Sequence, residues 1–361
     1  IGGASTIGIA ENAFSVGLSA GWYDTAWAIG AVLTAFLAVK YLRKSGYNTI
    51  SKLVDDLYGK STSFIMVIAM VIIQCGIIAL QYKAGGSILA SLLPDIFTVE
   101  TGTFFSFVIF MLVAMIGGMG SVSLTNVLNL VLIYVGVIVA AFLVLNGHGG
   151  WEAIDSLVVS QPDVPYMSLT AGMGWIGIFS WIVVMIGNTN SVQGVVQIGL
   201  TARSDKAARN GYILGAALMV PVGFICALLG VASKALLPDS TGAVALPMIL
   251  MSLPPVLGGL TLSGLWAADM GTGCSMIIGL STTVSSDIIF REKNTQEIQH
   301  KYVFVNKVIV VVCSLVTYLV ATQMGAILGA MQKALSLAIG TSFIVIGGLF
   351  CPRFASKKAG F

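Results

Sequence analysis

The chain has 361 residues, of which 57% are hydrophobic and only 9% are Asp, Glu, Lys or Arg, against about 25% charged residues in an average soluble domain. So few charges exclude a water-soluble enzyme, a nucleic-acid binder, which needs a basic face, and a disordered chain, which needs low hydrophobicity. The remaining class is a polytopic helical membrane protein surrounded by the lipid bilayer.

Long uncharged runs predict the membrane spans. No charged residue occurs from 101 to 151, and this run is long enough for two spans of about 20 residues. The runs lack the alternation of a barrel strand, so helices are expected to satisfy the backbone in lipid. Ten hydrophobic segments follow in chain order: 1–18, 20–41, 61–92, 103–119, 124–146, 171–198, 208–233, 256–290, 303–321 and 325–350.

The first segment is Gly-rich and too short to cross a bilayer. Such half-helices occur in transporters, where a helix breaks and its free backbone groups bind ions or substrate. We therefore expect the chain to be the core of a longer transporter, lacking the first half-helix and the C-terminal helices.

Two connecting segments carry apolar residues at helical spacing. Ile50, Leu53, Val54 and Leu57 recur among charged residues, which predicts a short helix lying at the membrane interface. Residues 151–159 predict another on the opposite side. For both, a connector packed on the helical bundle is the alternative.

The positive-inside rule orients the spans. Fourteen of the eighteen basic residues fall in loops that alternating topology places on one side, the cytoplasm: Lys40, Arg43, Lys44, Lys52, Lys60, Arg203, Lys206, Arg209, Arg291, Lys293, Lys301, Arg353, Lys357 and Lys358. The opposite loops carry mainly acidic residues, and Asp24 is assigned to them. The first segment is therefore predicted to run outward.

Ionisable residues inside spans are costly, so each is a candidate functional residue. They are Glu11, Lys83, Asp269, Lys307 and Lys333. Lys307 lies near a helix start and can snorkel. Glu11 is assigned either to a solvated vestibule or to a solute contact, and Lys83 and Lys333 either face the bundle or snorkel.

Asp269 is the most informative of these residues. It lies one helical turn from Thr272, with small residues around it, so both side chains can point into one cavity. A hard cation such as sodium prefers oxygen ligands of this kind. The pattern predicts ion or proton coupling, with a structural Asp bonded to a neighbouring helix as the alternative.

Several stretches resemble the sodium:solute symporter family, which includes sodium/glucose, sodium/proline and sodium/sialic acid transporters. Residues 2–20 resemble the outer half of the family's first core helix, and 202–211 resemble the turn after core helix six. Residues 246–259 resemble the approach to core helix eight. The most specific match is helix eight itself, from Ala267 to Asp287, and together the matches cover essentially the whole chain.

The resemblance implies an all-α integral membrane fold, a five-plus-five inverted repeat of the leucine-transporter type in a single domain of residues 1–361. Its halves would be about 1–146 and 171–350. It also implies a sodium site between the first core helix and helix eight. By position, the ligands would be the backbone carbonyls of Ile1 and Ala268 and the side chains at positions 271 and 272, which here are Gly271 and Thr272.

Some residues depart from the family pattern. The family usually has Ser at the position of Gly271, and we hypothesise that Asp269 compensates for the lost hydroxyl. Asn126 stands where some members have an Asp that serves a second sodium site, which argues against that site here. Helix six usually carries Gln-Arg near its end, whereas Gln197 is followed by Ile198.

These observations predict a secondary active transporter of the cell membrane that couples the symport of a small solute to sodium by alternating access. A proton-coupled or uncoupled carrier and a transporter-like sensor domain are the alternatives. No catalytic motif is present, so an enzyme is not expected. The polar side chains assigned to the solute site are Ser5, Glu11, Lys83, Asn188, Asn190, Gln193 and Lys333. The two lysines favour an anionic solute such as a small carboxylate.

Overall fold

The protein is described from a computed structural model. It describes residues 2–45, 49–116, 119–147, 149–200, 202–290, 299–325, 327–350 and 353, excluding the side chains of residues 38, 45, 119–125, 197, 299–303 and 327–334. Every regular element in these ranges is a helix.

The helices follow one another with short links. In the first half they are η1 (Ala4–Gly8), α1 (Ile9–Val16), η2 (Gly17–Gly21), α2 (Trp22–Phe36), α3 (Ala38–Ser45), α4 (Ile50–Tyr58), α5 (Lys60–Leu92), α6 (Val99–Ile116), α7 (Met119–Gly147) and α8 (Gly150–Ser160). In the second half they are α9 (Gly174–Ser191), α10 (Gln193–Leu200), α11 (Asp205–Leu236), η3 (Gly242–Val244), α12 (Ala245–Met251), α13 (Pro255–Thr283), η4 (Val284–Ile289), α14 (Gln299–Thr322) and α15 (Ile327–Phe350).

Within the described residues, each of the ten predicted hydrophobic segments contains helix, and the segment 171–198 is broken. It forms α9 and α10, which meet at an angle of 67°. Among the described residues, six helices are long and apolar enough to cross a membrane, or seven if this bent pair is one span. α13 is not among the six, because glycines, hydroxyl residues and Asp269 lower its hydropathy.

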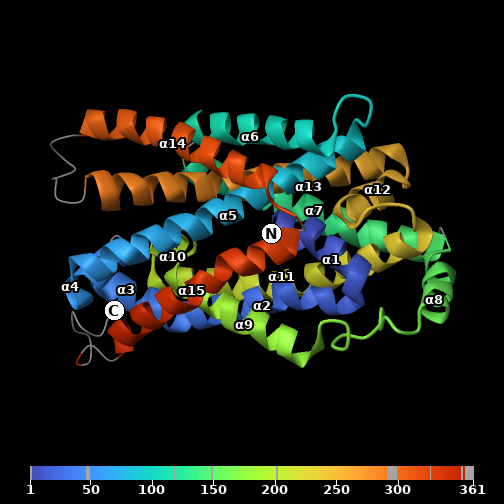
Figure 1. The fold of residues 1–361 in the computed structure, drawn as a ribbon, viewed down its shortest axis with the longest axis horizontal. Helices are drawn as coiled ribbons and strands as arrows, with labels where there is room; N and C mark the ends of the chain where they lie inside the picture. The colour runs from blue at the N-terminus through green and yellow to red at the C-terminus, as the bar shows by residue number, and fades with distance from the viewer. Residues whose placement is uncertain are drawn as a thin grey trace.

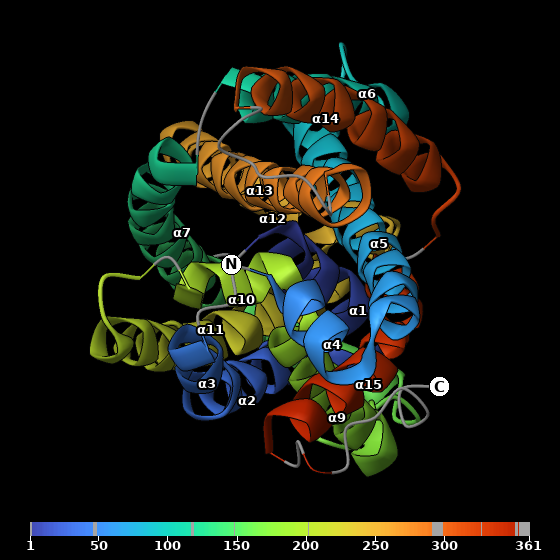
Figure 2. The same ribbon diagram turned by 90° about the vertical axis from the view of Figure 1, so that its left-hand side faces the viewer.

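The helices run roughly along the long axis of the molecule and enclose the short first helix (Figures 1 and 2). α2 packs between α9 and α11, while α5 contacts α6, α13, α14 and α15. η1 and α1 lie inside this arrangement, and Ile7, Ile9 and Ala10 are fully buried. The short helices η1 and α1 at the start of the chain therefore form the centre of the bundle.

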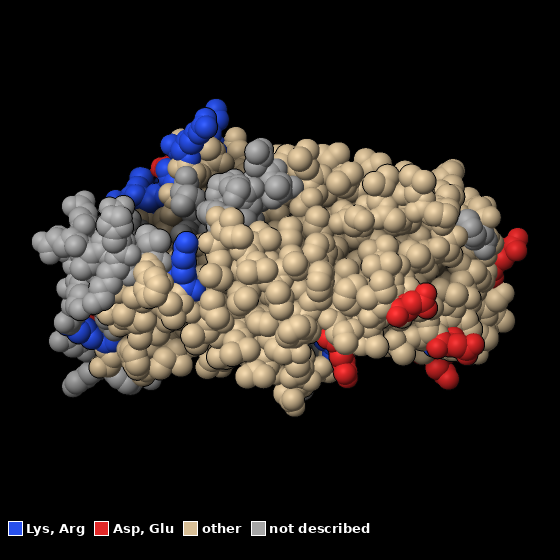
Figure 3. Space-filling view, turned by 90° about the horizontal axis from the view of Figure 1, so that it is seen from above, with Lys and Arg blue, Asp and Glu red and all other residues tan. Residues whose placement is uncertain are grey.

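The outer surface matches a lipid environment. Large apolar side chains are exposed along α6, α7 and α14, including Phe104, Val131 and Phe304. Continuous apolar surfaces of this kind mark contact with a partner or a membrane. Basic side chains gather at one end of the molecule and acidic ones toward the other (Figure 3), which is the charge separation that the positive-inside rule predicts.

The two connector helices pack on the bundle. In α4, Ile50, Leu53 and Val54 are buried against α5 and α15. In α8, Ile154 and Leu157 join the main core, whereas Val159 is exposed. The apolar stripe of each segment was predicted, but the stripes face protein, so the alternative of a packed connector describes them better than a helix lying in the interface.

Asp24 is not a loop residue, and its assignment to an outer loop was wrong. It lies in the first turn of α2, is fully buried, and packs against Gly223 of α11, where a methyl group would come within 2.8 Å of the Asp24 Cβ atom. Its two carboxylate oxygens have no hydrogen-bond partner among the described residues. A single carboxylate at the end of an apolar run looks like a loop residue in sequence, but here the outer end of α2 is covered by α11.

Candidate functional site

The first helix, formed by η1 and α1 and called helix one below, begins directly against α13. A methyl group on Gly2 would come within 2.8 Å of the Thr272 Oγ1 atom, and one on Gly3 would come within 2.7 Å of the Asp269 Oδ1 atom. Such distances are shorter than van der Waals contact, so both positions require glycine. The absence of these two side chains brings the backbone of helix one against the Asp269–Thr272 turn.

Asp269 is held in a closed environment. Its side chain is fully buried, and Oδ1 accepts a hydrogen bond from the Gly3 amide at 2.9 Å. The same amide donates to the Gln81 Oε1 atom of α5 at 3.0 Å. Oδ2 has no hydrogen-bond partner among the described residues and faces Gly85, where a methyl group would lie 3.2 Å away. The Gly3 amide thus ties helix one to both α5 and α13.

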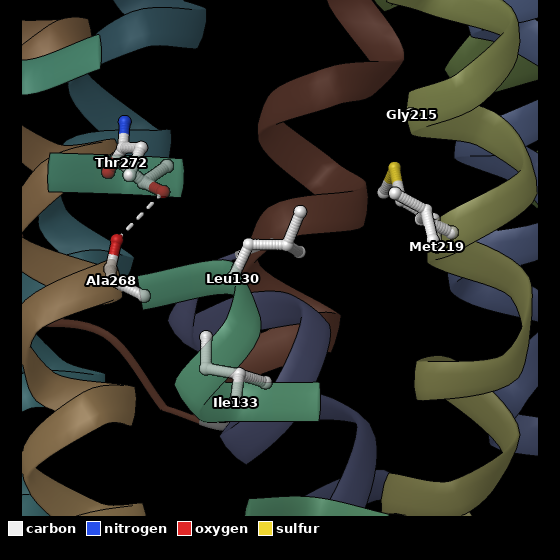
Figure 4. Close-up of a pocket in the computed structure, with 8 residues that line it drawn as sticks. Leu130, Ile133, Gly215, Met219, Ala268 and Thr272 are labelled. Atoms are coloured by element: carbon white, nitrogen blue, oxygen red, sulfur yellow. Dashed lines mark hydrogen bonds between the residues drawn. The ribbon is translucent and has the colours of Figure 1, made fainter. Parts of the chain in front are cut away.

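Thr272 lies beside Gly2 of helix one and also borders a cavity. Its hydroxyl donates to the Ala268 carbonyl at 3.1 Å, and both residues line a cavity of about 230 Å³ between α7, α11 and α13 (Figure 4). Asn126 of α7 also lines this cavity. A methyl group on Gly271 would overlap the Asn126 Oδ1 atom. The space beside Gly271 is therefore filled by an amide oxygen from α7.

The two faces follow from helix geometry. Residues two positions apart point to nearly opposite sides of a helix, so Asp269 and Gly271 face different neighbours. Asp269 points to helix one and α5, and Gly271 points to α7. Ile1, the other expected carbonyl ligand, lies outside the described residues.

A second break occurs between α9 and α10. Val192 adopts an extended backbone at the bend. Asn188 and Asn190 lie just before it and are fully buried. Both polar side-chain atoms of Asn188, and the Oδ1 atom of Asn190, have no hydrogen-bond partner among the described residues. Unpaired amide groups beside a broken helix are suited to bind a polar solute.

The remaining predicted solute contacts are dispersed. Ser5 is buried in η1 at the centre of the bundle. Lys83 is half-buried, and its ammonium donates to the carbonyls of Met324 (2.8 Å) and Gly325, between α14 and α15. Gln193 accepts from the Ile50 amide at 3.0 Å and so caps α4. Glu11 packs beside Gly242 of η3.

For Lys333 the structure gives only its place on α15, because its side chain lies outside the described residues. The structure therefore brings together the helix-one glycines with Asp269 and Thr272. It does not bring Lys83 and Gln193 into the same place, because each is engaged at a different helix junction.

Residues that sequence reasoning missed also face these sites. Asn126 had been considered only as evidence against a second sodium site, yet it lies against Gly271. Gln81, which shares the Gly3 amide with Asp269, carried only the weak signal of a polar residue within an apolar span. Both contacts join residues far apart in the sequence, and no local pattern indicates them.

Comparison with known proteins agrees with this architecture. The family model of the sodium:solute symporter family matches residues 1–359. The chain is 23% identical to a sodium/glucose cotransporter of Vibrio parahaemolyticus, over 98% of the chain and 71% of that protein. It is 22% identical to a sodium/proline symporter of Staphylococcus aureus, over 87% of the chain and 64% of that protein. The chain thus spans about two thirds of the length of these relatives.

The fold is shared with a solved transporter. A sodium-coupled sialic acid symporter, 17% identical in sequence, superposes with a TM-score of 0.80 over 99% of this chain and 78% of its own. This confirms the predicted all-α fold of the leucine-transporter type, whereas the predicted repeat boundaries stay a prediction. The match over nearly the entire chain shows that the protein belongs to the sodium:solute symporter family of multi-pass membrane transporters and is not an enzyme.

Proposed function

We propose that the protein is a secondary transporter of the cell membrane that couples the uptake of a small solute to sodium. The observation that carries the proposal is the direct packing of the Gly2–Gly3 backbone on the Asp269–Thr272 turn of α13. Broken helices that present backbone groups at the middle of the bundle form the ion and solute sites of such transporters.

The proposed sodium ligands are oxygens on the Thr272 side of α13. The Ala268 carbonyl and the Thr272 hydroxyl line one cavity with Asn126, and hard cations prefer carbonyl, hydroxyl and amide oxygens. Asn126 Oδ1 occupies the space in which the Cβ atom of any larger residue at position 271 would lie. We therefore assign Asn126, rather than Asp269, as the compensation for Gly271. The Ile1 carbonyl completes the predicted set.

The proposed role of Asp269 is to hold helix one against α13. Its carboxylate fixes the Gly3 amide, so the position of helix one depends on its charge and geometry. Binding of sodium beside Thr272 then stabilises the arrangement in which helix one rests on α13. A ligand shifts a conformational equilibrium only if it binds one state more tightly than the other. Sodium would bind more tightly to the state in which helix one contacts α13.

The solute is proposed to be small and polar, and to bind beside the α9–α10 break. Asn188 offers an unpaired donor and acceptor there. Asn190, two positions further along α9, points to a nearly opposite side of the helix. The expectation of an anionic solute rested on two lysines, and the Lys83 ammonium is already bound by two backbone carbonyls. We therefore favour recognition by hydrogen bonds, with an organic carboxylate as the competing class.

The test is uptake into proteoliposomes with imposed gradients. Inward sodium gradients should drive the accumulation of one member of a panel of labelled sugars, amino acids and carboxylates, and Asn188→Ala should abolish that accumulation. Uptake driven by a pH step without sodium would instead support a proton-coupled carrier. Sodium-dependent changes in intrinsic fluorescence without any accumulation would support the sensor alternative.

A further inference from the structure

A basic cavity lies at the cytoplasmic end of the molecule, away from the proposed transport site. It has a volume of about 270 Å³ and lies between the end of α2, the α3 helix and the start of α11. Figure 2 shows α3 beside α2 and α11 at this end. Its lining is Ala35, Phe36, Val39, Lys40, Asp205, Lys206 and Arg209.

The cavity has a net positive charge. Lys40, Lys206 and Arg209 supply three positive charges, and all three residues are exposed. The single acid, Asp205, is engaged by Arg43, whose Nε atom donates to its Oδ1 atom at 2.7 Å. The three basic groups are therefore left without an acidic partner inside the cavity, and their mutual repulsion favours an anion among them.

The frame of the cavity is built by an organised set of contacts. The Arg43 Nη1 atom donates to the carbonyls of Gly199 (2.8 Å), Leu200 (3.0 Å) and Ala202 (2.8 Å), at the end of α10. Its Nε atom holds Asp205, the first residue of α11. One guanidinium thus fixes α3 against α10 and α11, which keeps the basic side chains on one rim.

The other wall is apolar and lies at the edge of the membrane. Ala35, Phe36 and Val39 form it, and the Phe36 side chain is 49% exposed. In the sequence, Lys40 is the first charge after the uncharged run that follows Asp24. The apolar wall therefore faces acyl chains, and the basic rim lies at the level of the headgroups.

We propose that this cavity binds the headgroup of an anionic phospholipid of the cytoplasmic leaflet, with the lipid phosphate among Lys40, Lys206 and Arg209. Basic pockets between transmembrane helices on the cytoplasmic side are suited to anionic lipid headgroups. A soluble anion would use the basic rim alone, whereas a lipid also covers the apolar wall at Phe36. The bound lipid joins α2 and α3 to α11, at the end where Arg43 joins α3 to α10 and α11.

The test is native mass spectrometry of the full chain, released from detergent with either phosphatidylglycerol or phosphatidylcholine. The wild-type protein should retain phosphatidylglycerol and not phosphatidylcholine. Because each basic residue near a lipid surface contributes about a fivefold change in affinity, the triple variant Lys40→Gln, Lys206→Gln, Arg209→Gln should bind phosphatidylglycerol about a hundredfold more weakly. Lys44→Gln is the matched control, because Lys44 lies on the same helix outside the cavity.

Two further measurements compare the lipid with its deacylated headgroup, and the wild type with the triple variant. Phe36→Ala should weaken binding of phosphatidylglycerol while leaving binding of its deacylated headgroup, glycerophosphoglycerol, unchanged. If the deacylated headgroup binds as tightly as the lipid, the site takes a soluble anion and the lipid assignment is overturned. Equal retention of phosphatidylglycerol by the wild type and the triple variant, with unchanged thermal unfolding of both, would overturn the site itself.

Discussion

Two neighbouring polar residues of α13, Asp269 and Thr272, have different surroundings. Asp269 lies in an enclosed place, where helix one and α5 supply its contacts. Thr272 and Ala268, within one turn of Asp269, line a cavity that Asn126 of α7 shares. Both residues contact the start of helix one, but Asp269 is closed in by protein, whereas Thr272 has a cavity beside it. Neighbouring polar residues on one transporter helix can therefore have separate tasks.

The same comparison explains why Asp269 is a poor substitute for the hydroxyl missing at position 271. A carboxylate two residues from a vacant position points away from it. An amide on a different helix, Asn126, reaches that position. Changes at Asp269 should therefore weaken the contact that links helix one to α13, and changes at Thr272 or Asn126 should affect sodium binding.

The largest effect is expected from Gly3→Ala. The new methyl group would lie 2.7 Å from the Asp269 Oδ1 atom and would also overlap Ala84, and overpacking of this kind costs about 3 kcal/mol. Thermal unfolding in detergent should shift strongly downward, and uptake should be lost. Gly211→Ala is the control, since its methyl group would contact nothing within 4 Å. Equal stability of the two variants would show that helix one does not rest on α13.

Asp269→Asn is expected to have the next largest effect. The amide keeps the shape but weakens the acceptor for the Gly3 N–H group, and hydrogen bonds to charged groups contribute about 2 kcal/mol. Expression should persist, while coupled uptake should fall by at least about tenfold. The measurement is the ratio of sodium to solute transported in proteoliposomes. A normal ratio would leave Asp269 as a structural residue.

Gly271→Ser tests the assignment of Asn126. The serine side chain would overlap the Asn126 Oδ1 atom, and the resulting strain is about 1.5 kcal/mol. The variant should bind sodium poorly, and the double variant Gly271→Ser, Asn126→Ala should recover, because one hydroxyl replaces one amide oxygen. Sodium binding is read by calorimetry and by thermal shift, neither of which needs transport. Additive losses of sodium affinity in the double variant would show that the serine hydroxyl does not replace the Asn126 amide oxygen.

Thr272→Ala should have the smallest effect. It removes one oxygen from the cavity and leaves the contact between Asp269 and Gly3 unchanged, at a cost of about 1 kcal/mol for one hydrogen-bonding group. The sodium concentration for half-maximal uptake should rise about fivefold, with little change in unfolding temperature. Thr272→Ser keeps the hydroxyl and is the control. Unchanged sodium dependence in Thr272→Ala would remove the site from this side of α13.

From the sequence alone, the class and the order of the helices could be derived, and the orientation of the spans could be predicted. Uncharged runs of sufficient length can satisfy their backbone in lipid only as helices, and the loop lysines and arginines orient them. The sequence also located the turn from Asp269 to Thr272, because polar residues inside an apolar run are rare enough to be conspicuous.

Only the tertiary structure decided which partners these residues have. The contacts of Asp24 with α11, Lys83 with the α14–α15 link, and Asn126 with Gly271 all join distant segments. Local spacing gives the face of a helix, but the neighbour on that face depends on how helices cross. That crossing is set by close approach at glycines such as Gly2 and Gly3, where a missing side chain leaves no periodic signal in the sequence.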